Sequence, residues 1–138
     1  MRKKTPLSYI ELSKKNLIHN IEQFKNLAKE GTKFSVAIKG NAYGHGQKEI
    51  IKILEPYVDY FQIDSVEELE LLRKNSAKKA LVLGYAQKSD LGKAIELGCV
   101  LSVFSLEQVS TLSAMAESVD VRQEINIPID ACFGREGF

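Results

Sequence analysis

Phe34-Ser35-Val36-Ala37-Ile38-Lys39-Gly40-Asn41-Ala42-Tyr43-Gly44-His45-Gly46 is the stretch that decides the fold, because a β-prone apolar run passes directly into a glycine-rich loop. A helical pattern begins immediately afterwards, at about Gln47. A strand, a short loop and a helix in this order make the basic unit of a parallel α/β sheet. The stretch therefore predicts an α/β protein whose loop opens at the carboxyl end of a strand.

Four further β-prone runs follow, at residues 58–63, 80–83, 100–104 and 124–129. Their starts are roughly 20 to 25 residues apart, the length of one strand–helix unit. The runs are continuously apolar, which predicts strands buried on both faces. Five parallel strands fit either a flavodoxin-like doubly wound sheet or about five units of a (β/α)8 barrel, since a whole barrel takes roughly 250 residues.

The intervals between the runs carry helical signals. A recurring apolar face predicts a first helix over residues 17–28, and a shorter one over 50–54 is ended by Pro56. Ser65-Val66-Glu67-Glu68 and Ser105-Leu106-Glu107-Gln108 each have the form of a capping box, which starts a helix. Strands and helices therefore alternate along the chain.

Composition indicates one ordinary globular domain spanning residues 1–138, with 44% hydrophobic and 27% charged residues and a formal net charge of +1. No basic run suggests a nucleic-acid surface, and no apolar segment follows the basic opening Met1–Lys4. We therefore expect neither a nucleic-acid partner nor a membrane span, and a cytoplasmic location. Cys99 and Cys132 are too few for a disulfide framework or a zinc site, and no metal is expected.

Chemistry in barrels lies where strands end. The residues after the five runs are Lys39, Asp64, Gly84-Tyr85, Ser105 and Asp130, with Arg135 just beyond the last. A lysine directly after an apolar strand is unusual, because burial disfavours the ammonium form and makes the amine a nucleophile for an aldehyde. The alternative is a structural lysine whose amine reaches water.

The loop after Lys39 suits a ligand that approaches the backbone closely. Three glycines lie within seven positions, and Tyr43 offers a hydroxyl group to a phosphate oxygen. His45 is interpreted as a simple loop or capping residue. A glycine-rich loop that opens a helix is by itself a weak phosphate signal.

Residues 36–46 closely resemble the pyridoxal 5'-phosphate (PLP) attachment motif of alanine racemases, A-V-V-K-A-N-A-Y-G-H-G, with Gly40 in place of an alanine. Residues 16–21, 61–68 and 81–84 resemble the family's first helix, its second strand with the following helix, and its third strand. The resemblance implies a PLP-dependent (β/α)8 barrel followed by a β-rich domain, in a homodimer. It also implies interconversion of L- and D-alanine, which supplies a peptidoglycan precursor.

The same resemblance implies roles for three residues. Lys39 carries PLP as a Schiff base and serves as the acid and base on one face of the substrate. Tyr43 binds the cofactor phosphate. Arg135 faces the cofactor's phenolic oxygen and the substrate carboxylate, for which its permanently charged planar group is suited.

Residues 127–138 resemble the family's L-K-I-D-T-G-M-G-R-L-G-F, with two departures. Pro128 stands where many members have a lysine that helps to position the arginine, and residues 131–133 replace Thr-Gly-Met. The resemblance also reaches its end before three of the barrel strands and the opposite-face base. We therefore expect a piece of a longer protein that is inactive alone and prone to aggregate.

Two other functions stay open at this point. One is a non-catalytic PLP-binding protein with a single barrel, of the kind that maintains PLP supply, although such proteins do not carry the continuation Asn41–Gly46. The other is a PLP-free α/β domain in which Lys39 is structural.

Overall fold

A computed structural model describes residues 7–138, so the basic opening Met1–Lys4 lies outside the described residues. Five parallel strands form one sheet: β1 (Ser35–Ala37), β2 (Tyr60–Ile63), β3 (Lys79–Val82), β4 (Val100–Ser102) and β5 (Glu124–Asn126). The helical elements are α1 (Lys14–Leu27), α2 (Lys39–Tyr43), α3 (Gln47–Leu54), the 3-10 turn η1 (Glu55–Tyr57), α4 (Val66–Arg73), α5 (Leu91–Leu97) and α6 (Leu106–Ser118). The helices of the described chain are too short or too polar to serve as membrane spans.

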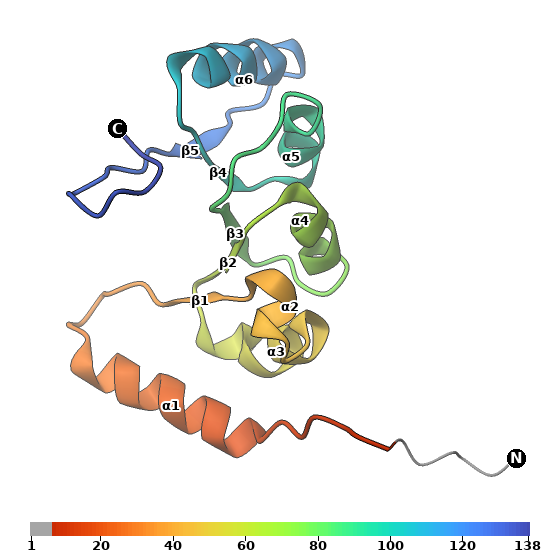
Figure 1. Cartoon of the computed structure of the whole chain (residues 1–138), viewed down its shortest axis with the longest axis vertical. Helices are drawn as coiled ribbons and strands as arrows, with labels where there is room; N and C mark the ends of the chain where they lie inside the picture. The colour runs from red at the N-terminus through yellow and green to blue at the C-terminus, as the bar shows by residue number, and fades with distance from the viewer. Residues whose placement is uncertain (1–6) are drawn as a thin grey trace, which may run out of the picture.

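Strand order and helix placement identify the architecture. The strands lie in sequential order, β1-β2-β3-β4-β5, and α3 to α6 all stack along one side of the sheet (Figure 1). A flavodoxin-like sheet has the order 2-1-3-4-5 and helices on both faces. The structure is therefore an incomplete (β/α)8 barrel, as one of the two predictions had it, and the flavodoxin-like alternative is wrong.

The core lies between the sheet and these helices. Its fully buried side chains come from alternate strand positions and from the inner helix faces: Phe61, Ile63, Val82 and Leu101 from or next to the strands, and Ile51, Leu69, Leu72, Leu91 and Leu112 from the helices. Helix α1 lies beyond the β1 edge and contacts α3 (Figure 1). It reaches the core through Ile21 and Leu17, whereas Phe24, expected on the same face, is 63% exposed.

The second face of the sheet corrects the prediction of strands buried on both sides. Here polar side chains join neighbouring strands: Gln62 donates to Ser35 at 2.7 Å, and Asn126 donates to Ser102 at 3.2 Å. Lys79 and Glu124 form an ion pair on the amino side. Tyr60, Leu81 and Val100 are half-buried apolar residues on this face, so apolar and polar side chains share it.

The capping residues position the loops at the carboxyl ends of the strands. Ser65 and Ser105 accept hydrogen bonds from the backbone N–H groups of Glu68 and Gln108, as the capping boxes predict. The return bonds differ, because Glu68 accepts from Asp64 N at 2.8 Å and Gln108 accepts from Phe104 N at 2.9 Å. Each return bond therefore fixes the residue before the cap, Asp64 or Phe104, which lies just past the end of a strand.

Candidate functional site

The carboxyl ends of the strands open on a cavity of about 1080 Å³. Its lining includes Lys39, Tyr43, Asp64, Tyr85, Asp130 and Arg135. One cavity is thus lined by all three residues singled out in the sequence, Lys39, Tyr43 and Arg135, although about ninety residues separate the first two from the third.

Lys39 leaves β1 beside the end of β2. The strands pair with Ala37 opposite Gln62, and two residues further along this register places Lys39 opposite Asp64. Lys39 Nζ donates to Asp64 Oδ1 at 2.9 Å. The Lys39 side chain is 27% exposed, so the amine is neither sealed among apolar groups nor extended freely into water.

The segment that follows Lys39 is a left-handed turn, where the sequence suggested an irregular loop. Gly40, Asn41, Ala42 and Tyr43 have φ values of 56°, 55°, 55° and 54°. Each non-glycine residue in this region costs about 1 to 2 kcal/mol. Hydrogen bonds offset the cost: Ala42 N donates to the Ile38 carbonyl at 2.8 Å, and the Asn41 side chain accepts from Gln47 N at 2.8 Å, which caps α3.

One carboxylate ties the lysine to its partner. Glu68 Oε1 accepts from Gly40 N at 2.6 Å, and Glu68 Oε2 accepts from Asp64 N at 2.8 Å. We call Lys39, Gly40, Asp64 and Glu68 the lysine bracket. Gly84 supports it from β3, because its N–H donates to the Asp64 carbonyl at 3.1 Å and a Cβ there would come within 2.4 Å of the same oxygen.

Arg135 lies on a loop of different construction, residues 130–138, here called the arginine loop. Asp130 Oδ1 accepts from Phe133 N at 2.8 Å and from Gly134 N at 3.1 Å. Asp130 N donates to the Phe138 carbonyl, and Phe138 N donates to the Pro128 carbonyl. The Arg135 side chain is 67% exposed and its Nε lies 3.8 Å from Glu136.

Pro128 shortens the last strand. The apolar run predicted a strand over 124–129, but β5 ends at Asn126. Proline has no N–H to donate to a sheet, so the ladder stops before it. The chain is then free to turn into the arginine loop.

Tyr43 and His45 lie on the surface of the turn. Tyr43 is 66% exposed and lines the cavity. His45 Nδ1 lies 3.0 Å from the Ala42 carbonyl, in keeping with the interpretation of this histidine as a loop residue. Tyr43 is thus the member of this pair that faces the cavity.

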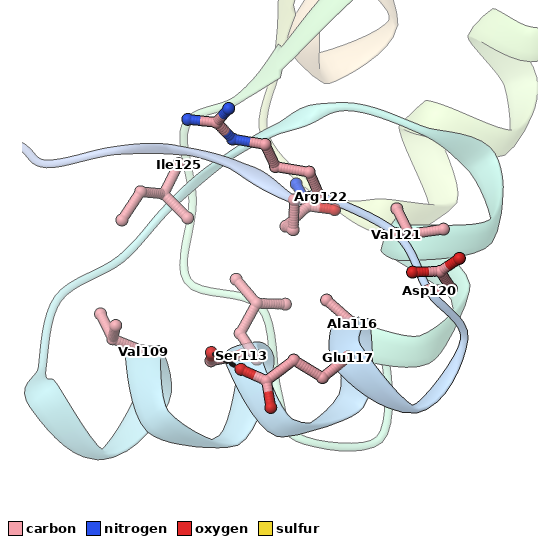
Figure 2. Close-up of a pocket in the computed structure, with 10 residues that line it drawn as sticks. Val109, Ser113, Ala116, Glu117, Asp120, Val121, Arg122 and Ile125 are labelled. Carbon is pink, nitrogen blue, oxygen red and sulfur yellow. Dashed lines mark hydrogen bonds between the residues drawn. The ribbon is translucent and has the colours of Figure 1, made fainter.

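A second hollow, of about 590 Å³, lies between α6 and β5 (Figure 2). Val109, Leu112 and Ala116 from α6 and Ile125 from β5 give it an aliphatic lining. The Ser113 hydroxyl donates to Glu117 at 3.0 Å. Lys39, Tyr43 and Arg135 are not among the described residues that line it. The chemistry-bearing side chains therefore gather in the first cavity.

Two residues of the bracket escaped the sequence reasoning. Asp64 was noted as a strand end, but its pairing with Lys39 was not inferred, although ends of neighbouring parallel strands must be adjacent. Glu68 was interpreted as half of a capping box. A capping carboxylate directly after a strand that ends beside a lysine is the signal that would have found it.

Comparison with known proteins agrees with the fold and the motif. Residues 12–138 match the family described as "Alanine racemase, N-terminal domain". Alanine racemase 2 of Caldanaerobacter subterraneus subsp. tengcongensis is 33% identical over 131 residues, and the match covers 94% of this chain and 34% of that protein. Alanine racemase of Clostridium kluyveri is 37% identical, with 93% of this chain and 33% of that protein covered.

Solved structures give the same result. The alanine racemase of Clostridium difficile 630 superposes with a TM-score of 0.85 at 33% sequence identity, over 90% of this chain and 33% of that one. The chain spans about a third of the length of the relatives it matches. Since the family match covers all five strands and the left-handed turn, the chain belongs to the alanine racemase N-terminal domain family.

Proposed function

We propose that this chain supplies the cofactor-anchoring part of a PLP-dependent amino-acid racemase that interconverts L- and D-alanine. The observation that carries the proposal is the amine of Lys39, held at the carboxyl end of β1 in a cavity that Tyr43 and Arg135 also line. The proposal includes a homodimer acting in the cytoplasm, as the family resemblance implies.

The donor set of the cavity fits PLP. A primary amine is the group that attaches an aldehyde, and Lys39 provides one with 27% of its side chain exposed. A tyrosine hydroxyl and a guanidinium suit the phosphate and the phenolic oxygen, and Tyr43 and Arg135 provide them. When bound, PLP withdraws electrons from the substrate Cα and so stabilises the charge left by a departing proton.

The chain's own residues then divide the work. Lys39 holds the cofactor and exchanges a proton with Cα on one face of the substrate. Arg135 would hold the substrate carboxylate, for which its planar, permanently charged guanidinium is suited. Tyr43 fixes the phosphate end. A racemase needs a second proton-transfer group on the opposite face, and we assign that group to the other two-thirds of the relatives' length.

Absorbance on mixing the chain with PLP tests the anchor. An absorption band of the C=N linkage is expected, and borohydride reduction followed by peptide mass mapping is expected to find the cofactor on Lys39. Lys39→Ala abolishes the band, whereas Lys33→Ala, which removes a lysine paired with Asp59, leaves it intact. A band that survives Lys39→Ala would refute the assignment.

Deuterium exchange separates the racemase from a non-catalytic PLP-binding protein. With PLP bound, the racemase proposal expects solvent deuterium to enter Cα of one alanine enantiomer, because Lys39 serves one face. A chain that binds PLP on Lys39 and exchanges neither enantiomer would favour the binding protein.

A further inference from the structure

Asp64 is placed against the Lys39 nitrogen by the pairing of the strands. The register of β1 and β2 sets the two residues opposite each other, and Lys39 Nζ meets Asp64 Oδ1 at 2.9 Å. Both side chains belong to the wall of the same cavity. A carboxylate therefore lies at hydrogen-bond distance from the atom that would join an aldehyde.

The backbone of Asp64 is fixed on both sides. Its N–H donates to Glu68, and its carbonyl accepts from Gly84 N. Glu68 also accepts from Gly40 N, so one carboxylate holds the residue that follows Lys39 and the residue that pairs with it. The distance between the amine and the Asp64 carboxylate is thus constrained by the fold as well as by their attraction.

In the other lysine–carboxylate pairs of the described chain, a larger fraction of the lysine side chain is exposed. The Lys33 side chain is 77% exposed in its pair with Asp59, and the Lys93 side chain is 42% exposed in its pair with Glu96, against 27% for Lys39. A less exposed pair is less weakened by water and salt. Lys39 is therefore the least exposed lysine among the ion pairs of the described residues, Lys79 at 52% included, while its partner Asp64 is 53% exposed.

We propose that Asp64 is the counter-ion of the Lys39 nitrogen, both as an ammonium group and after it has joined an aldehyde. The second half rests on the proposed function. In that step the amine adds to the aldehyde carbon, a C=N bond forms and the carbonyl oxygen leaves as water, with no change of oxidation state. The C=N nitrogen is positively charged when it holds a proton, and the adjacent carboxylate stabilises that form.

The other charged and titratable groups near the nitrogen are accounted for. Glu68 on α4 is engaged with two backbone N–H groups. Tyr43, Tyr85, Asp130, Arg135 and Glu136 also line the cavity. Among these groups, Asp64 is the one within hydrogen-bond distance of Lys39 Nζ.

The first measurement needs no cofactor. Hydrogen exchange of the lysine ammonium protons is followed by ¹⁵N NMR on the full chain and on Asp64→Asn, Asp64→Glu and Asp59→Asn. Exchange at Lys39 is expected to become severalfold faster in Asp64→Asn, to be largely restored in Asp64→Glu, and to be unchanged in Asp59→Asn. Unchanged exchange in Asp64→Asn would overturn the proposal, whether or not PLP binds.

The second measurement follows the C=N absorption of the PLP-loaded chain against pH. Loss of the carboxylate in Asp64→Asn is expected to lower the midpoint for release of the C=N proton by about one pH unit, a tenfold change in affinity for the proton. Asp59→Asn is expected to titrate like the original chain. An unmoved midpoint in Asp64→Asn would overturn the counter-ion role, whereas absence of any band from the original chain would defeat the proposed function and leave the NMR result to decide on Asp64.

Backbone amide spectra of each variant show whether it has folded. Asn is nearly isosteric with Asp, and the bonds from Asp64 to Glu68 and Gly84 use backbone atoms that the substitution keeps. We therefore expect the spectra of Asp64→Asn to change near the cavity and to stay the same elsewhere.

Discussion

The lysine bracket and the arginine loop lie across one cavity, yet they are built in opposite ways. The bracket is tied to the helices and the sheet by the Glu68 side chain of α4 and by the backbone of Gly84, just after β3. The arginine loop is closed by bonds among residues 128–138, and its residues 131–138 are all exposed. The difference teaches that several elements of the fold fix the position of the amine, whereas Arg135 is carried by an exposed loop that bonds mainly to itself.

The largest expected effect comes from the core beneath the bracket. Leu69, on the helix that carries Glu68, is fully buried, so Leu69→Ala is expected to lower the free energy of unfolding by about 2 to 5 kcal/mol. Phe133→Ala, in the arginine loop, is expected to change it by less than about 0.5 kcal/mol, since Phe133 is 82% exposed. Urea unfolding measures both changes. Comparable losses of stability in the two variants would contradict the contrast between the packed bracket and the exposed arginine loop.

Gly84→Ala is expected to be next in size. Its Cβ would meet the Asp64 carbonyl at 2.4 Å, and relief requires the backbone of the bracket to move, at a cost of about 3 kcal/mol. Gly134 in the arginine loop has open space around it and a φ of 77°, so Gly134→Ala is expected to cost about 1 kcal/mol. Thermal unfolding checks the order, and a larger loss for Gly134→Ala would contradict it.

Removal of the bridging carboxylate is expected to have a smaller effect. Glu68→Ala leaves Gly40 N and Asp64 N without their acceptor and is expected to cost about 2 kcal/mol. Glu67→Ala is the control for loss of a carboxylate from the same helical turn, because Glu67 is exposed and its hydrogen bond goes to Ser65, which is not part of the bracket. Asp130→Ala is expected to cost under about 1 kcal/mol, because water replaces its bonds to an exposed loop.

Amide hydrogen exchange tests the same point locally. Glu68→Ala is expected to speed exchange at Gly40 and Asp64 and to leave the arginine loop unchanged. Fast exchange at those two amides in the original chain would show that the bracket does not hold them.

The last comparison concerns the two cysteines, whose reactivity with a thiol reagent is expected to differ and to depend on pH. Burial raises the pKa of the Cys99 thiol to about 11, and nearby Arg73 opposes this in part. Iodoacetamide at pH 8 is therefore expected to label the exposed Cys132 of the arginine loop and to spare Cys99 in the folded chain. Equal labelling of the two thiols would contradict the burial of Cys99.

The same pKa predicts a loss of stability in alkali. An unfolded cysteine loses its proton near its ordinary pKa of 9.0, whereas folded Cys99 keeps it to about 11. Because the folded state then binds the extra proton, the free energy of unfolding is expected to fall between about pH 9 and pH 11. Cys99→Ala is expected to remove this contribution, which unfolding curves at pH 8 and pH 10 measure.

The order of strands and helices could be predicted from the sequence because each unit carries local signals. The Ser65 and Ser105 caps are confirmed, and each of the five predicted runs overlaps a strand. Periodicity left open the choice between a barrel and a doubly wound sheet, the motif resemblance favoured the barrel, and the structure confirms the barrel because its helices cover one face. That arrangement arises from packing between distant segments, which periodicity does not report.

The candidate site could be predicted from the sequence only in part. Lys39 stood out because it ends an apolar strand, but its bond to Asp64 depends on the pairing register of β1 and β2. The left-handed turn escaped prediction because Ala42 and Tyr43 adopt it against their own preference, supported by bonds from Ile38 and Asn41. The roles of Lys39, Tyr43 and Arg135 stay predictions.

One of the polar pairs on the open face of the sheet has a consequence for how the chain finds its native pairing. A parallel strand that slips by two residues keeps every apolar side chain on the correct face, so burial hardly distinguishes the slipped sheet from the right one. The Asn126–Ser102 bond does distinguish them, since Asn126 lies directly opposite Ser102 and a slip in either direction separates the two side chains. This amide therefore favours the observed register of β4 and β5 by more than the burial of apolar side chains alone.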